Sequence, residues 1–115
     1  MVHTLQTKRI YEPKAASDGV RILVDRIWPR GISKAAAALD LWLKDVAPST
    51  ELRKWFAHRP DRWAEFQRCY FLELGSSAAI AELRALADVG PVTLLYAARD
   101  EDHNEAVALA AFLKA

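Results

Sequence analysis

The sequence predicts a small α/β domain in which helices cover a short, mostly parallel sheet. Two apolar runs, Val20–Ile27 and Val92–Ala97, have the nearly continuous hydrophobic character of strands buried on both faces. Between them, apolar residues recur at helical spacing in segments that Pro and Gly separate. The predicted order of elements is β-β-α-α-α-α-β-α, in one domain that spans residues 1–115.

Residues 4–11 form the first expected strand, and Val20–Ile27 form the second. A turn at Ser17-Asp18-Gly19 lies between them, and Trp28-Pro29 ends the second strand. The connection is too short for a helical crossover. The two strands are therefore either antiparallel neighbours or separated by another strand.

The segments that follow the second strand are predicted to be helices. Ser33 is positioned to cap a helix over Lys34–Leu39, which the amphipathic stretch Asp40–Val46 continues. After a break at Pro48, Ser49 is expected to cap a short helix that ends near residue 56.

A longer helix is expected to start at Pro60 and end at Gly75. Ser77 would cap the following helix, which Gly90-Pro91 closes. The apolar face of the longer helix consists of Trp63, Phe66, Tyr70 and Leu74.

The third expected strand is Val92–Ala97, and the last helix covers Glu101–Lys114. Asp100 is a favourable N-cap for that helix, and the acidic residues that follow it suit the positive end of the helix dipole.

Composition and charge narrow the classes of function. The chain has 115 residues, of which 52% are hydrophobic and 27% charged, as in globular proteins. The longest uninterrupted apolar run, Ala106–Leu113, is too short to cross a bilayer, so no membrane partner is expected. The first residues do not resemble a signal peptide, and the lone Cys69 cannot form an internal disulfide. A cytoplasmic location is the expectation.

Charge is unevenly distributed along the chain. Residues 1–58 hold ten Lys or Arg and six Asp or Glu, whereas residues 59–115 hold six and nine. A basic half beside an acidic half suggests either a site for an anion or association through opposite faces, and an ordinary solvated surface explains it equally well.

Polar side chains follow two of the predicted strands where each strand ends. The first group is Asp25, Arg26, Trp28, Arg30 and Lys34, and the second is Tyr96, Arg99, Asp100, His103 and Asn104. Ligands of open α/β sheets bind beyond the carboxyl ends of the strands. If the two strands are parallel neighbours, both groups line one crevice.

These residue types suit an anionic ligand of phosphate or nucleotide type. Arg26, Arg30 and Lys34 supply the positive charge. The ligand-binding candidates also include Arg9 and Asn104, with Trp28 and Tyr96 as aromatic walls.

The catalytic candidates are Asp25, Asp100 and His103, since His103 with either carboxylate could transfer a proton near neutral pH. The same three residues could hold a metal only if they converge, and no zinc-type spacing is present, so no metal site is predicted. A structural role is the competing interpretation, with Asp25 and Arg26 paired across the sheet and Asp100 acting as a cap alone. No glycine-rich phosphate loop is found, and no cofactor is identified.

The string Asp18–Gly31, which contains Val-Asp-Arg-Ile-Trp-Pro-Arg-Gly, resembles the YeaO-like family, a branch of the bacterial domain-of-unknown-function 488 proteins. The resemblance continues through Trp42-Leu43-Lys44-Asp45, Leu52–Phe56 and His58 and closes with Thr93–Ala98, Asp100, His103 and Asn104. It covers nearly the whole chain. It implies a small stand-alone protein of bacteria or archaea and brings no settled activity with it.

The leading hypothesis is a crevice that binds a small anion, and whether a reaction follows binding stays open. The first alternative is a noncatalytic interaction module or homodimer. Single-stranded nucleic-acid binding is the third, and it is favoured least because the net charge is only +1.

Overall fold

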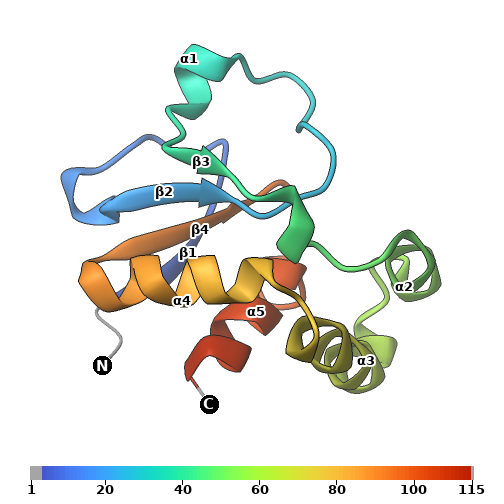
Figure 1. The fold of residues 1–115 in the computed structure, drawn as a ribbon. Helices are drawn as coiled ribbons and strands as arrows, with labels where there is room; N and C mark the ends of the chain where they lie inside the picture. The colour runs from blue at the N-terminus through green and yellow to red at the C-terminus, as the bar shows by residue number, and fades with distance from the viewer. Residues whose placement is uncertain (1–3, 115) are drawn as a thin grey trace.

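A computed structural model describes residues 4–114. Its sheet has four parallel strands in the order β1-β4-β2-β3 (Figure 1). The strands are β1 (Leu5–Arg9), β2 (Val20–Leu23), β3 (Leu41–Trp42) and β4 (Val92–Tyr96). The predicted α/β class with a parallel sheet is confirmed.

The last strand in sequence is central in the sheet. β4 pairs with β1 on one side and with β2 on the other, from Val20 opposite Val92 to Leu23 opposite Leu95. The first two strands are therefore separated by another strand, which was one of the two arrangements left open. All five residues of β4 are buried, as its continuous apolar sequence predicts.

The stretch Asp40–Val46 is not a helical continuation, and that prediction is wrong. α1 is confined to Lys34–Ala37, with Ser33 as its N-cap, and ends on a left-handed Ala38. The chain then pairs with β2 through Asp40 N–H to the Arg21 carbonyl and Leu43 N–H to the Leu23 carbonyl, both at 2.9 Å. This pairing adds β3, and the following turn, η2, covers Lys44–Val46.

The helices between β3 and β4 occur close to where the sequence places them. They are α2 (Thr50–Phe56), the short η3 (Pro60–Arg62), α3 (Trp63–Gly75) and α4 (Ala79–Val89). Ser49 caps α2 by accepting the Leu52 N–H at 3.2 Å, as predicted. Ser77 does not cap α4, whose first turn follows Ala78 without a side-chain cap.

The last helix, α5, covers Glu105–Lys114 and starts later than predicted. Asp100 Oδ1 accepts the N–H groups of Asp102 and His103, both at 2.9 Å, so Asp100 caps a turn that precedes the helix. Asn104 caps α5 instead, because its Oδ1 accepts the Val107 N–H at 3.0 Å.

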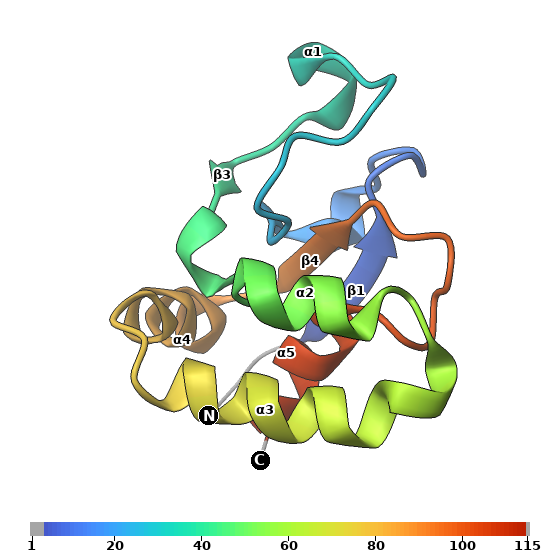
Figure 2. The ribbon, with the colours of Figure 1, turned by 90° about the vertical axis from the view of Figure 1, so that its right-hand side faces the viewer.

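The two faces of the sheet are covered differently (Figures 1 and 2). One face packs on α4 and α5, with α2 and α3 on the same side, and Ile22, Leu94 and Tyr96 belong to this larger core. The opposite face is covered by α1 and its flanking loops, which pack on a smaller core around Leu23 and Leu95.

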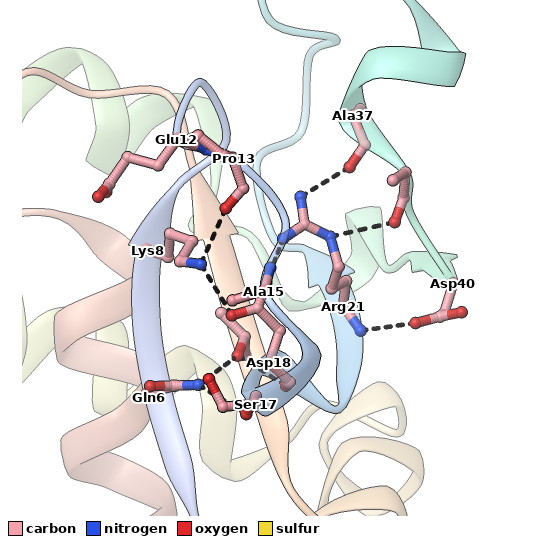
Figure 3. Close-up of polar contacts among 12 residues, drawn as sticks. Gln6, Lys8, Glu12, Pro13, Ala15, Ser17, Asp18, Arg21, Ala37 and Asp40 are labelled. Carbon is pink, nitrogen blue, oxygen red and sulfur yellow. Dashed lines mark hydrogen bonds and ion pairs between the residues drawn. The ribbon is translucent and has the colours of Figure 1, made fainter.

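A buried ion pair lies on the face of the sheet that α1 covers (Figure 3). Arg21 in β2 is fully buried and pairs with the buried Asp18, which also binds Lys8 of β1 at 2.8 Å. The Arg21 guanidinium also donates to the carbonyls of Ala37 at 2.8 Å and Ala38 at 3.1 Å. It thereby fixes the end of α1 against the sheet.

Among residues 4–114, no helix is both long enough and apolar enough to span a membrane.

Candidate functional site

A cavity of about 600 Å³ lies at the carboxyl ends of β2 and β4. Three chain segments line it at this edge: residues 25–27 after β2, residues 97–100 after β4, and Asn104 with Glu105 at the start of α5. Both groups of polar residues that follow the strands therefore contribute to one cavity. This is the arrangement expected when β2 and β4 are parallel neighbours.

The opposite wall of the cavity is apolar and is formed by the helical layer. Phe56 of α2 and Phe66 of α3 stack with ring centroids 4.4 Å apart, and Ala47 and Pro48 lie beside them. These four residues are buried. The cavity thus combines an apolar wall with polar groups on the strand-end side, a combination typical of small-molecule sites.

The position of α2 at the cavity is fixed by a carboxylate of α3. Glu73 accepts the Ser49 N–H at 2.8 Å and the Ser49 hydroxyl at 2.6 Å. Since Ser49 is the N-cap of α2, this contact sets where the helix begins. One turn later, Arg53 reaches the cavity.

Basic side chains from three segments surround the cavity. They are Arg26 after β2, Arg53 on α2 and Arg99 after β4, and all three are exposed. Within residues 4–114, none of them forms an ion pair with a carboxylate. Their charge is therefore available to a ligand.

His58 adds a titratable group to the same wall as Arg53. Ala57 and His58 both adopt left-handed conformations, with φ of 49° and 55°. These two residues turn the chain sharply at the end of α2 and bring His58 to the lining of the cavity.

Asp25 lies on the strand-end side and is held by the backbone. Its Oδ2 accepts the Ala97 N–H at 3.1 Å, and its carbonyl accepts the Trp42 indole N–H at 2.7 Å. Its Oδ1 is buried and receives no hydrogen bond from any N–H or hydroxyl group of residues 4–114. The neighbour that can satisfy this oxygen is another carboxyl group, that of Glu105.

Glu105 occupies the first turn of α5 and lines the cavity together with Asp25. Burial raises the pKa of Glu105 well above its ordinary value, and the hydrogen bond and negative charge of Asp25 raise it further, while Arg53 lowers it. The raised pKa favours the protonated form of Glu105 beside Asp25.

Asp100 and His103 form a second pair, with His103 Nδ1 and Asp100 Oδ2 at 2.9 Å. The Asp102 N–H and the His103 side chain lower the pKa of Asp100, against a smaller opposing effect of burial. The His103 ring also packs edge-on against Trp63 at 5.3 Å. Of the two carboxylates considered for His103, the structure therefore joins it to Asp100, and Asp25 pairs with Glu105.

Five of the predicted ligand-binding residues are not on the walls of this cavity. Arg9 donates to the carbonyls of Ala97 and Ala98, and Tyr96 is buried in the larger core. Trp28 and Lys34 line a separate hollow of about 290 Å³ near β3, and the Arg30 side chain is exposed. Asp25, Arg26, Asp100 and Asn104 do line the main cavity.

Three polar residues of the cavity were not among the sequence-based candidates: Arg53, His58 and Glu105. Arg53 and His58 belong to the helical layer. Neither follows a predicted strand, so the search for polar residues after strands did not identify them. Their place in the family resemblance was the one available signal. From the sequence, Glu105 was interpreted only as a negative charge that favours the start of a helix.

A metal centre is not formed by the predicted residues. Within residues 4–114, no three His, Cys, Asp or Glu side chains are grouped so that they could hold a metal ion. Asp25 and Asp100 line the cavity, whereas His103 is not among its lining residues, so the three side chains do not converge on one point.

Comparison with known proteins places the chain among uncharacterised relatives. Residues 4–115 match the model of DUF488-N3i, described as the inactive DUF488-N3 subclade. The protein YeaO of Escherichia coli is 47% identical over 113 residues, which covers 96% of each chain. An uncharacterised protein of Mycobacterium tuberculosis is 47% identical over 109 residues, 95% of this chain and 92% of that protein. No solved structure matches the chain.

Proposed function

The chain belongs to the YeaO-like branch of the DUF488 family, and we propose that its cavity binds a small anionic ligand of phosphate or nucleotide type. The observation that carries the proposal is the meeting of Arg26, Arg53 and Arg99, from three separate segments, on one cavity. Guanidinium groups bind phosphate and carboxylate oxygens through paired N–H donors.

The size and lining of the cavity favour a small molecule over a polymer. A volume of about 600 Å³ lies within the range of roughly 300–1,000 Å³ that is usual for small-molecule sites. Phe56 and Phe66 offer an apolar surface on which the uncharged part of a ligand can pack. A nucleotide or a sugar phosphate combines such a part with an anionic group.

Binding without turnover agrees best with the residues present. The matching family is described as an inactive subclade. His103 is hydrogen-bonded to Asp100, but of these two residues only Asp100 lines the cavity, so the imidazole is not on the cavity wall as an acid–base group. The site is proposed as a receptor for the ligand.

The interaction module has weaker support. The large apolar side chains that are exposed lie on five different segments: Tyr11, Ile27, Trp55, Leu72 and Val89. A binding patch for a protein partner would require such residues to be contiguous.

A thermal-shift screen tests the proposal directly. Purified protein is heated with inorganic phosphate, pyrophosphate, nucleoside monophosphates and sugar phosphates. A ligand that binds only the folded state stabilises it by about 2.7 kcal/mol at a hundredfold excess over Kd. A rise in melting temperature with compounds of this class supports the proposal. No rise with any of them, at concentrations that reach the millimolar range, would contradict it.

A further inference from the structure

The cavity carries charged groups of both signs, and they differ in exposure. The arginines are exposed, whereas Asp25 and Glu105 are half-buried, with Asp25 Oδ1 inaccessible to solvent. Both carboxyl groups lie where β2 ends and α5 begins. A ligand that fills the cavity therefore meets exposed arginines and less exposed carboxyl groups.

Within residues 4–114, neither Asp25 nor Glu105 forms an ion pair with a Lys, Arg or His side chain. Arg26, its neighbour in sequence, directs Nη2 to the carbonyls of Ala47 at 3.3 Å and Pro48 at 3.5 Å. Arg53 acts on Glu105 only through its charge, and no hydrogen bond joins the two side chains. In most proteins two such carboxyl groups would be matched by a hydrogen-bonded cation.

The charged and titratable groups around the Asp25–Glu105 pair come from four segments. They are Arg26 after β2, Arg53 and His58 at α2, Tyr70 and Glu73 on α3, and Arg99 and Asp100 after β4. Asp100 is already engaged by His103 and by two backbone N–H groups. The pair is therefore a part of the cavity to which, within residues 4–114, no cation is hydrogen-bonded.

We infer that the ligand is zwitterionic, with an ammonium group that binds between Asp25 and Glu105 and an anionic group that binds Arg53 and Arg99. This inference rests on the proposed function and specifies the class of ligand. An ammonium group has three donors and no acceptor, so it can satisfy the unpaired Asp25 oxygen and Glu105 together. On binding, it replaces the proton of Glu105, whose pKa is raised by burial, and that proton passes to the solvent. No covalent bond of the ligand changes.

Matched probes separate the two parts of the ligand. We would titrate the protein with ω-aminoalkyl phosphates of increasing chain length and with the corresponding alkyl phosphates, using calorimetry at about pH 7. The two series share the phosphate and differ only in the ammonium group. At the best chain length, the amino compound is expected to bind at least about tenfold more tightly than its alkyl counterpart.

Proton release supplies an independent readout. Titrations in two buffers of different ionisation enthalpy give the number of protons released on binding. The amino compound is expected to release about one proton more than the alkyl compound. Changes in phosphate protonation are common to both probes and cancel in this difference.

Two conservative variants locate the effect. In Asp25→Asn and in Glu105→Gln, the preference for the amino compound and the extra proton release are expected to disappear. Glu101→Gln, an exposed change of the same charge, should keep the preference.

The outcomes distinguish this inference from the proposed function. If both probe series bind equally well, with equal proton release, the anion site stands and the zwitterionic ligand is ruled out. A preference for the amino compound that survives in both carboxyl variants also overturns the inference. If neither series binds, the inference and the proposed function fail together.

Discussion

Asp25 and Glu105 bring two carboxyl groups to one cavity at the edge of the sheet, Asp25 from the segment after β2 and Glu105 from the first turn of α5. Burial and the charge of Asp25 raise the pKa of Glu105. The folded protein therefore binds this proton more tightly than the unfolded chain does. The resulting stability is fully present below the unfolded pKa of Glu105 and is lost as the pH rises through the folded pKa.

Glu105→Gln should remove this pH dependence. The amide can still donate to Asp25 but cannot ionise, so the variant resembles the protonated wild-type protein. We expect its melting temperature to exceed that of the wild type by a few degrees at about pH 8 and to match it near pH 4. Thermal unfolding across this range measures the difference. Equal melting curves at both pH values would show that the pair does not hold a proton.

Arg21→Met should destabilise the protein strongly. It leaves the buried Asp18 without its closest cation and removes the donors to the carbonyls of Ala37 and Ala38. Breaking one side of a buried ion pair costs about 3–5 kcal/mol. Urea unfolding gives the value, with the exposed Arg30→Met as a control that should change by less than about 0.5 kcal/mol. A similar small loss for both variants would contradict the structural role of Arg21.

Asp18 should make the protein sensitive to acid. Although burial opposes its ionisation, hydrogen bonds from the Ala15 N–H, Lys8 and Arg21 lower its pKa from 3.8 to about 2. A lowered folded pKa means that the stability is present above the unfolded value and is lost as the pH falls toward about 2, a loss of about 2 kcal/mol. The free energy of unfolding measured between about pH 5 and pH 2 should show this decrease. Asp18→Asn should show a smaller slope there, and an unchanged slope would refute the assignment.

Asn104→Ala tests the position of the last helix. Asn104 is buried, caps α5 through the Val107 N–H, and donates to the Asp100 carbonyl at 2.9 Å. Loss of such a cap costs about 1–2 kcal/mol. Asp102→Ala, an exposed change in the preceding turn, should have little effect in the same denaturation assay. If Asp102→Ala destabilised the protein more than Asn104→Ala did, the helix would start at the earlier turn.

The long apolar elements could be predicted from the sequence, and the shortest strand could not. β2, β4 and the apolar face of α3 were found because their hydrophobic patterns extend over several residues. β3 has only two residues, and its neighbourhood was read as helical. Leu39, Leu41 and Leu43 alternate with polar or amphipathic residues there, which was a strand signal. Whether this segment forms a strand depends on its pairing with β2. That pairing is a tertiary contact, which the local sequence pattern does not determine.

The strand-end half of the site was predictable, and the helical half was not. Asp25, Arg26, Asp100 and Asn104 follow apolar strands, and the topology of parallel sheets brings them together. Arg53 and His58 are far from any strand end in sequence. Their position depends on the Glu73–Ser49 contact and on two left-handed residues after α2. These features arise only when the helices pack.

The central claim is that arginines on the cavity bind an anion, and Arg53→Ala tests it most directly. Calorimetry with pyrophosphate would compare this variant with Lys54→Ala, which removes the same charge from the next, exposed position of α2, outside the cavity. We predict that Arg53→Ala weakens binding at least about tenfold, whereas Lys54→Ala changes it by less than about twofold. Equal effects of the two substitutions would mean that only the overall charge attracts the anion, and would contradict a site in the cavity.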